Sequence, residues 1–481
     1  MAHNKFLPRV LAAAAAMMLL AGCSSKADPG FSPANPVNIT IWTYYNGEQL
    51  EAFNALVDEF NSTVGKEQGI TVESSSHGSV TDLENNVLAS AEGKVGAEAM
   101  PNIFSAYADT AYALDEMGQI ADLSDYLSEE DRAAFIEDYL SEGDFSGSGS
   151  IKIFPVAKSA ELLFLNETDW EPFAAATGAT YDDLATIEGL VSVAERYYEW
   201  TDAQTPDIPN DGRAFFGRDA MANYMLIGAK QLGCTIFAAQ GGSMTLNFDH
   251  DAVRTLWDNY YVPFIKGYFS ASGRFRSDDV KTGNIIAYVG SSSSATFFPT
   301  QVIADDMDSH DITRKALESP KFANGEDYAV QQGAGMVVTK ASDAEIQASL
   351  VFLKWFTSPE HNITFSVDSG YLPVTHEGNS IDAIRISGLA LSDEMDEVLS
   401  AAVDTVNENH LYTPRAFSGG TNARAILEYS MSDKASADRA AVKEAMAQGQ
   451  SFEEASAQFL SDKCFEVWYQ DTLASLEAFQ G

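Results

Sequence analysis

The chain has 481 residues, of which 45% are hydrophobic, 11% aromatic and 21% charged, and this mix excludes disordered, collagen-like and coiled-coil proteins. Lys and Arg number 29 against 70 Asp and Glu, so the formal net charge is −41, which repels phosphate backbones and excludes nucleic acid as an expected partner. The length predicts two or three domains, and ligand clefts often form between domains.

Residues 1–23 have the pattern of a secretory signal peptide with a lipobox: a weakly basic start, an apolar run from Val10 to Leu20, and small residues ending at Cys23. The apolar run is too short to span about 30 Å of hydrocarbon. Leu20-Ala21-Gly22-Cys23 resembles a bacterial lipoprotein signal, which implies cleavage before Cys23, lipidation of that thiol (palmitate included), and a membrane-anchored protein at the cell surface or in the periplasm. The alternative is a secreted protein cut nearby.

Residues 24–36 are polar and rich in Pro, Gly and Ser, a composition that predicts a flexible tether. Beyond it, Cys234 and Cys464 are the remaining cysteines. They either form a disulfide in an oxidising exterior or stay as separate buried thiols, and the spacing leaves both alternatives open.

The next part of the chain alternates strands and helices. Apolar periodicity predicts strands at 38–43, 70–75 and 102–107 and helices at 48–61, 82–92 and 111–117. Such alternation predicts an α/β fold with a mainly parallel sheet, whose ligand crevice lies beyond the carboxyl ends of the strands. The loops at 42–47 and 106–109 are therefore the first places to expect a binding site.

A Ser and Gly cluster at 146–150 marks a turn, and the apolar run 151–166 after it predicts a hairpin or a crossover between domains. Downstream, the sequence predicts helices at 182–200, 219–232 and 251–265, with Asp182, Asp219 and Asp251 as N-caps. It further predicts strands at 284–289 and 328–339, a helix at 343–357, and a nearly all-helical chain from 392 onward.

The spacings that hydrolysis, phosphoryl transfer or hydride transfer require do not occur in this sequence. The seven His are scattered, and the 70 carboxylates are too abundant for a catalytic pair to be identified. The sequence therefore predicts no catalytic residue, no metal site and no cofactor.

Loops rich in aromatic and hydroxyl side chains fit a polar ligand instead. Aromatic rings stack on the apolar face of a sugar while hydroxyls, amides and carboxylates bind its hydroxyl groups, so Trp42, Tyr44 and Tyr45 are predicted stacking residues. Trp42 has an equally good alternative as a core residue, since one face of a strand must be buried. The serines at 291–294 either bind a ligand or form a flexible loop.

Several segments together resemble the extracellular solute-binding proteins of ABC importers, in the subgroup that carries sugars and glycerol phosphate. The segments are Ile39-Thr40-Ile41-Trp42, Leu162-Leu163-Phe164-Leu165-Asn166, Gly333-Ala334-Gly335-Met336-Val337-Val338, Phe352-Leu353-Lys354-Trp355-Phe356 and Ser369-Gly370-Tyr371-Leu372-Pro373. The resemblance implies an α/β, two-lobe periplasmic-binding-protein-like (type II) fold with a hinge and an interlobe cleft. One lobe would hold residues 37–157 and 331–375, and the other 158–330 and 376–481.

The resemblance also implies which residues contact the solute. Ser159, Ser292, Ser293, Gly333 and Tyr371 fall where such members place ligand contacts, and Arg415 lies near the place of a basic residue. Aromatic rings and polar side chains of the loops are further predicted contacts: Trp42, Tyr44, Tyr45, Asn46, Asp109, Glu161 and Phe297. Asp109 stands one position from the acid that the family pattern expects, which counts against glycerol phosphate itself.

The resemblance implies a monomeric, non-enzymatic lipoprotein that captures a carbohydrate between two lobes and delivers it to the membrane permease of an ABC importer. The alternative within this class is glycerol 3-phosphate or another phosphorylated polyol, held by Arg415 and the Ser292 region through charge-assisted hydrogen bonds. A different class is a lipid-anchored glycoside hydrolase, which would release products from oligosaccharides. A surface adhesin would bind no small molecule at all.

Overall fold

The computed structural model describes residues 30–303 and 309–480. The predicted signal peptide, Cys23 and the first part of the predicted tether lie outside these residues. The described end of that tether is packed rather than extended: Ser32 and Asn35 form a backbone bridge, and Phe31 is buried in the core. The positive φ of Gly69 lets its backbone approach Ser32 closely, so this segment is fixed to the protein.

The first lobe is built on a four-stranded sheet in the order β13-β3-β1-β2. β1 (Val37–Thr43) pairs in parallel with β2 (Ile70–Ser76) and β3 (Ile103–Ala106), while β13 (Gly335–Val338) is antiparallel to β3. These three N-terminal strands confirm the sequence prediction. The helices of this lobe are α1 (Gly47–Ser62), α2 (Val64–Gln68), α3 (Val80–Ala91), α4 (Ala108–Glu116), α5 (Glu129–Ala133), α6 (Glu137–Ser141), α12 (Asp343–Phe356) and α13 (Pro359–Ser369).

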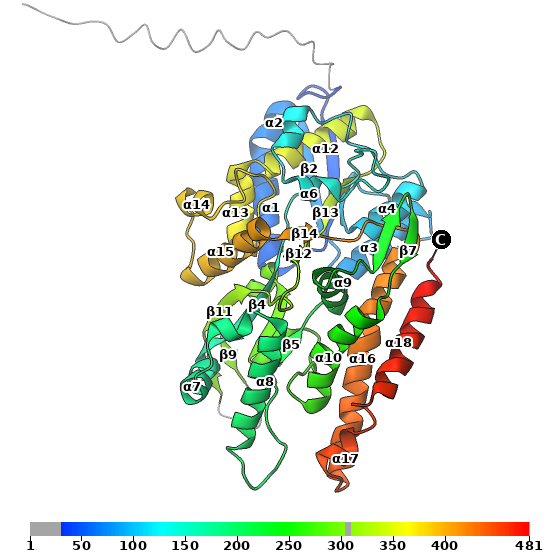
Figure 1. The fold of residues 1–481 in the computed structure, drawn as a ribbon. Coiled ribbons are helices and arrows are strands. Elements are labelled where there is room, and N and C mark those ends of the chain that lie inside the picture. Colours follow the sequence, from blue (N-terminus) through cyan, green and yellow to red (C-terminus); the bar gives the residue numbers. More distant parts are fainter. Residues whose placement is uncertain (1–29, 304–308, 481) are drawn as a thin grey trace, which may run out of the picture.

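The pleat of β1 explains how helices cover both faces of this sheet. Ile39 and Ile41 point to one face and join the core with residues of α1 and α12. Trp42 points to the other face, where it packs with Phe104 and with residues of α3 and α4. Because β1 and β3 run parallel, their carboxyl ends lie at the same edge of the sheet. In Figure 1 this lobe, with β2 and β13 labelled, is the upper one.

The second lobe has its own four-stranded sheet, in the order β11-β4-β8-β5. β4 (Glu161–Asn166) is antiparallel to β8 (Ala287–Ser291) and to β11 (Arg314–Glu318), and only β5 (Phe216–Arg218) is parallel to its neighbour β8. The mainly parallel arrangement predicted from residues 38–117 therefore describes the first lobe, whereas in the second lobe β4 lies beside strands that run the other way.

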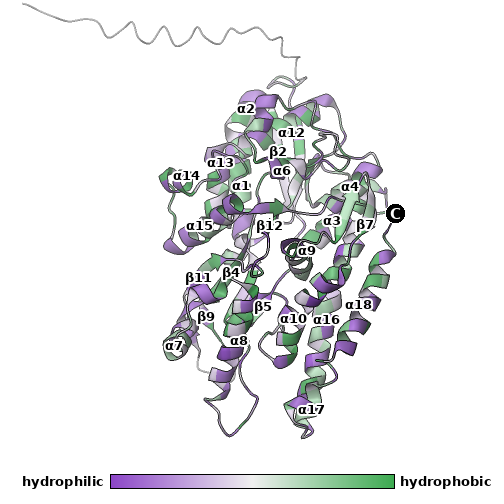
Figure 2. Ribbon diagram, in the orientation of Figure 1, coloured by the Kyte–Doolittle hydropathy of each residue, from purple (hydrophilic) through white to green (hydrophobic). Residues whose placement is uncertain are grey.

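Helices surround this second sheet. Hydrophilic and hydrophobic residues alternate along the outer helices α8, α16 and α18, as Figure 2 shows.

The second lobe also has two minor strand pairs, β6 with β7 and β9 with β10. The bounds are α7 (Glu167–Thr177), η1 (Tyr181–Leu184), α8 (Ile187–Asp202), α9 (Met221–Gln231), β6 (Phe237–Gln240), β7 (Ser243–Leu246), α10 (His250–Lys266), α11 (Arg276–Lys281), η2 (Ser292–Phe297), β9 (Gln301–Val302), β10 (His310–Asp311), α14 (Ile381–Ile386), α15 (Asp393–Glu408), α16 (Gly420–Ala447), α17 (Phe452–Ser456) and α18 (Asp462–Glu477).

Three extended segments connect the lobes side by side. The predicted strand at 328–339 is in fact two strands in different sheets: β12 (Tyr328–Val330) pairs with β14 (His410–Tyr412), and β13 joins the first lobe. Between them Gln332 pairs with Ser159, and the adjacent Lys158 pairs with Leu372. We call these residues, 157–159, 331–333 and 371–373, the hinge segments.

Lys158 lies at the centre of the hinge segments and is completely buried. Its ammonium donates a 2.8 Å hydrogen bond to the carbonyl of Gly333 and forms an ion pair with Glu142 of the first lobe. Gly333 has a positive φ of 97°, and a Cβ there would meet the Ala157 carbonyl at 2.9 Å, so glycine is required for this close approach. The backbone that approaches Gly333 so closely is that of another hinge segment.

The predicted helix starts lie within a few residues of the observed ones, but the predicted caps are wrong. Thr186 and Asp249 accept the capping hydrogen bonds of α8 and α10, from the amides of Gly189 and Ala252. At α9 the N-cap residue Ala220 supplies no capping side chain, and the carboxylate of Glu428 from α16 accepts a hydrogen bond from the Ala222 amide. A cap is decided by which side-chain oxygen reaches the free amides, and that oxygen can come from a distant helix.

Cys234 and Cys464 are both free thiols. Cys234 is buried and lies 3.3 Å from the carbonyl of Asn247, whereas Cys464 lies near the hydroxyl of Tyr261. Of the two alternatives that the sequence leaves open, the structure has separate thiols.

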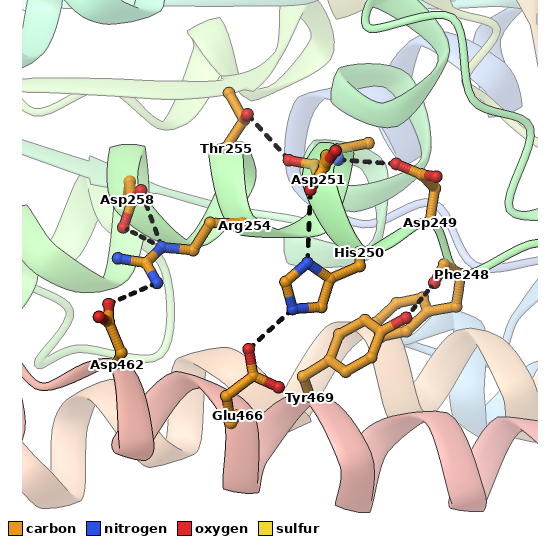
Figure 3. Close-up of polar contacts among 11 residues, drawn as sticks. Phe248, Asp249, His250, Asp251, Arg254, Thr255, Asp258, Asp462, Glu466 and Tyr469 are labelled. Carbon is orange, nitrogen blue, oxygen red and sulfur yellow. Dashed lines mark hydrogen bonds and ion pairs between the residues drawn. The ribbon is translucent and has the colours of Figure 1, made fainter.

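The C-terminal helix α18 is fixed to α10 by aromatic rings and by surface ion pairs. Trp468 lies 4.8 Å from the ring of Trp257, and Tyr469 stacks on Phe248 while donating a 2.6 Å hydrogen bond to its carbonyl. Figure 3 shows His250 of α10 reaching Glu466 of α18 at 2.8 Å. The apolar contacts hold the helix, and the ion pairs add a pH-dependent contribution.

Replacing His250 with glutamine should lower the melting temperature slightly at about pH 5.5 and leave it unchanged at about pH 8.5. The hydrogen bond to Glu466 raises the pKa of His250, so its contribution is complete below the ordinary pKa of about 6.5 and is lost as pH rises through the folded value. Thermal unfolding at both pH values measures this. An equal loss at both pH values would show that the effect is not electrostatic.

Candidate functional site

A groove with a volume of about 730 Å³ lies between the two lobes, a size typical of small-molecule sites. In the first lobe, the groove is lined by residues that follow β1, by the start of α1 and by one hinge segment: Tyr44, Asn46, Gln49 and Tyr371. In the second lobe, the groove is lined by the residue after β5, by α11 and the residue before it, and by the segment from η2 to just after β9. These residues are Asp219, Phe275, Ser277, Asp278, Lys281, Ser293, Ser294, Phe297, Phe298, Pro299, Thr300, Gln301 and Ile303. A solute in this groove touches both lobes.

Hydroxyl and amide groups form the part of the groove where the lobes meet. The hydroxyls of Tyr44 and Tyr371 lie 3.3 Å apart, and Gln49 donates a 3.3 Å hydrogen bond across the lobes to the carbonyl of Ser293. Burial raises the pKa of both tyrosines, that of Tyr44 well above its ordinary value. Both phenols therefore keep their protons at neutral pH and can donate hydrogen bonds to a ligand.

Asp219 supplies a carboxylate to the groove from the end of β5. It accepts a 3.2 Å hydrogen bond from the amide of Arg276, whose Nε lies 3.5 Å from the same oxygen. Burial raises the pKa of Asp219 to about 6, although the Arg276 guanidinium acts to lower it. This carboxylate is ionised at neutral pH, and the lone pairs that Arg276 does not occupy can accept hydrogen bonds from the hydroxyl groups of a ligand.

An apolar rim borders the groove on the second lobe. Phe275, Phe297 and Ile303 are each about half exposed although they are large apolar side chains. Exposed aromatic rings beside hydroxyl, amide and carboxylate groups give the groove one apolar and one polar wall, which matches the two kinds of surface on a sugar ring.

Five of the predicted contact residues line this groove: Tyr44, Asn46, Ser293, Phe297 and Tyr371. The others lie elsewhere. Tyr45 and Trp42 are buried in the core, where Trp42 packs against the ring of His77. Of the two alternatives for Trp42, a stacking residue or a core residue, the structure has the core residue. Ser292 is completely buried and donates to the carbonyl of Gly370, and Ser159 and Gly333 belong to the hinge segments.

Glu161 and Arg415 also lie outside the lining of this groove. Glu161 is buried and satisfied by a 2.7 Å hydrogen bond from Asn223 and by an ion pair with Arg218. Arg415 is exposed and lies beside Gly147. Arg424, a second basic residue on this side of the lobe interface, donates to Asn223, and its charge acts to lower the pKa of Asp109.

Sequence reasoning missed Gln49, Asp219, Lys281 and Arg424. Asp219 was assigned only as a helix cap, yet it directly follows β5, whose carboxyl end lies beside that of the parallel strand β8. The rule that ligands bind at the carboxyl ends of parallel strands would have found it. Arg424 carries no local signal, because its position depends on where α16 begins.

Within residues 30–303 and 309–480, no group of three or more His, Cys, Asp or Glu side chains is arranged to hold a metal ion. Among the helices in that same part of the chain, none combines the length and the apolar character that crossing a membrane requires.

The sequence profile of the bacterial extracellular solute-binding proteins matches residues 55–384, which is more than half of the chain. A search of curated proteins finds no match.

Solved structures of binding proteins resemble this fold over nearly its whole length. The cyclic α-maltosyl-1,6-maltose binding protein of Arthrobacter globiformis is 16% identical with a TM-score of 0.64, covering 92% of this chain and 100% of that one. UgpB of Mycobacterium tuberculosis, solved with glycerophosphocholine, is 16% identical with a TM-score of 0.65, covering 92% and 98%. An ABC substrate-binding protein of Listeria monocytogenes, solved with cycloalternan, is 15% identical with a TM-score of 0.60, covering 88% and 99%. At such identities the likeness shows the two-lobe fold, which the sequence analysis predicted.

Proposed function

The chain belongs to the bacterial extracellular solute-binding proteins, and from that premise we propose that it captures a carbohydrate in the interlobe groove and delivers it unchanged to the permease of an ABC importer. The observation that carries this proposal is the groove itself. It joins two tyrosine hydroxyls, amides and serines to a carboxylate and an exposed aromatic rim, and both lobes contribute. Two of the similar structures bind sugar rings according to their descriptions.

The charges of the groove favour a neutral sugar over a phosphorylated polyol. Among the described residues that line it, Lys281 is the one cation, and it is accompanied by the carboxylates of Asp219 and Asp278. A phosphate dianion needs several donors or cations to replace its hydration, and two neighbouring carboxylates repel it. The predicted phosphate ligand Arg415 is not in the groove lining.

We further propose that the lobes comprise residues 37–157 with 331–375 and residues 158–330 with 376–481, and that they close by rotation about the hinge segments. Antiparallel pairing of Lys158 with Leu372 and of Ser159 with Gln332 connects the three hinge segments to one another, so they bend as one unit. Anchoring through a lipidated Cys23, at the cell surface or in the periplasm, and a monomeric state complete the proposal.

Thermal-shift and calorimetric titration of the chain without its first 22 residues test the solute class. Maltodextrins and other neutral oligosaccharides should raise the melting temperature, because a ligand that binds only the folded state stabilises it. A rise with glycerophosphodiesters or glycerol 3-phosphate and none with neutral sugars would contradict the carbohydrate proposal. Release of shorter sugars during the incubation would contradict the binding role and indicate a glycoside hydrolase.

Replacing Phe297 with alanine should weaken binding of the identified sugar about tenfold, since loss of one ring contact costs about 1–2 kcal/mol. The side chain is 49% exposed, so its removal should leave the melting temperature of the free protein almost unchanged. Tyr429→Ala is the matched control, because Tyr429 is an exposed aromatic on α16 that does not line the groove. Unchanged affinity in the Phe297 variant, measured by calorimetry, would exclude the rim from the site.

A further inference from the structure

We propose that α4 of the first lobe, together with the start of α16 and the β6–β7 hairpin of the second lobe, forms a latch that holds the lobes together independently of the solute groove. The latch residues are Asp109 and Tyr112 on α4, Gly242 in the hairpin, and Gly420 and Arg424 on α16. None of them lines the groove. In Figure 1 the hairpin lies beside α4, close to the upper end of α16.

The first contact joins Asp109 to the first residue of α16. A Cβ built on Gly420 would collide with the carboxylate of Asp109. The two helices therefore approach so closely that the side chain of one lobe lies directly on the backbone of the other. α4 and α16 belong to different lobes, so rotation about the hinge segments must break this contact.

The second contact is built in the same way by the hairpin. Gly242 has a positive φ of 83°, and a Cβ there would collide with the hydroxyl of Tyr112. The carbonyl of Gly242 also accepts a 3.2 Å hydrogen bond from the amide of Ser418, just before α16. The hairpin and α16 are thus tied to each other, and both rest on α4.

Arg424 is held in place from within the second lobe. It donates to Asn223, which is buried and donates a 2.7 Å hydrogen bond to Glu161, and Glu161 forms an ion pair with Arg218. This chain of contacts fixes the guanidinium before the lobes meet. Its charge acts to lower the pKa of Asp109, so a preorganised cation of the second lobe partly offsets the cost of burying this carboxylate of the first lobe.

The groups facing Asp109 make the latch sensitive to pH. Burial raises the pKa of Asp109 to about 6; Arg424 of α16 acts to lower it, and Glu84 of α3 and Glu142 before the hinge act to raise it. Glu84 is itself partly buried, which raises its pKa, and it accepts a 2.8 Å hydrogen bond from Thr110. We expect Asp109 to dominate the pH response and Glu84 to add to it with the same sign.

The sign of the response follows from proton linkage. Opening exposes Asp109 to water, and its pKa returns toward the ordinary value of about 3.9, so closure takes up a proton. The latched state is therefore favoured most below about pH 4, and this advantage is lost as pH rises through about 6. Because each pKa unit is a tenfold change in an equilibrium, the ratio of latched to open protein should fall up to about 100-fold across this range.

Two variants of the chain without its first 22 residues test the latch in the absence of solute. Gly420→Ala places a methyl group against Asp109 and should open the lobes, which increases the radius of gyration in small-angle X-ray scattering and speeds hydrogen exchange of the Ser418 amide about tenfold or more. Asp109→Asn keeps the shape and removes the charge, so it should stay latched at about pH 7 and lose more than half of the pH response. Thr421→Ala and Glu98→Gln, at exposed positions, are the controls.

The latch proposal is overturned if Gly420→Ala matches the unsubstituted protein in scattering and exchange, or if Asp109→Asn retains the full pH response. Far-UV circular dichroism and melting curves separate opening from unfolding, because an opened protein keeps its helices. No solute enters these measurements, so their outcome does not depend on whether the groove binds a carbohydrate.

Discussion

Replacing Lys158 with alanine is expected to lower the free energy of unfolding by about 3–5 kcal/mol. The side chains of Lys158 and Glu142 are 0% and 5% exposed, so the substitution leaves a carboxylate buried without its cation. It also removes the donor to the Gly333 carbonyl. The loss comes mainly from this uncompensated charge, and much less from the missing attraction.

Denaturant titration measures this loss, and two further variants identify its cause. Lys94→Ala breaks an ion pair with Glu92 in which the side chains are 63% and 41% exposed, and it should cost less than about 1 kcal/mol. The double variant Lys158→Met with Glu142→Leu removes both charges and should recover most of the stability, because an apolar pair of similar volume is often as stable as a buried ion pair. A double variant as unstable as Lys158→Ala would locate the effect in packing instead of charge.

Replacing Asp219 with asparagine should weaken sugar binding about 10- to 100-fold at about pH 7.5, since hydrogen bonds to a charged acceptor contribute about 1.5–3 kcal/mol. Asp219 keeps a raised pKa of about 6. As pH falls through that value the carboxylate becomes protonated and loses acceptor capacity, so the affinity of the unsubstituted protein should fall toward that of the variant.

Calorimetric titration at about pH 5 and about pH 7.5 checks both parts of this prediction. The variant should bind with nearly equal affinity at the two values once the shared pH response of the latch is subtracted, because Asp109 is present in both proteins. Asp433→Asn, an exposed acidic residue of α16, controls for the general loss of negative charge. Equal affinity of Asp219→Asn and the unsubstituted protein at about pH 7.5 would remove Asp219 from the binding site.

Local patterns predicted the first lobe well because its elements follow one another along the chain. The alternation of Ile39 and Ile41 with polar residues predicted β1, and the apolar stripe of the following segment predicted α1. The second lobe was predicted less well, since strand direction is set by which segments pair in space. No local pattern shows that β4 runs antiparallel to both of its neighbours.

The site was predicted only in part, for a related reason. Tyr44 and Tyr45 are equally aromatic and adjacent in sequence, yet one lines the groove and the other is buried with Phe53 and Phe365. Neighbours in an extended segment point to opposite sides, and only the packed lobe decides which side is the groove. Arg415 and Arg424 likewise differ in whether they precede or follow the first turn of α16.

The order in which the chain is synthesised determines when the first lobe can complete its sheet. β13 completes the sheet of the first lobe at the edge beside β3, but it is made after every strand of the second sheet. A growing chain therefore cannot finish its first sheet until residue 338 has emerged, and pairing across so many residues is intrinsically slow. A nascent chain that stops before β13 has an unpaired edge on β3, and we expect it to be prone to aggregation.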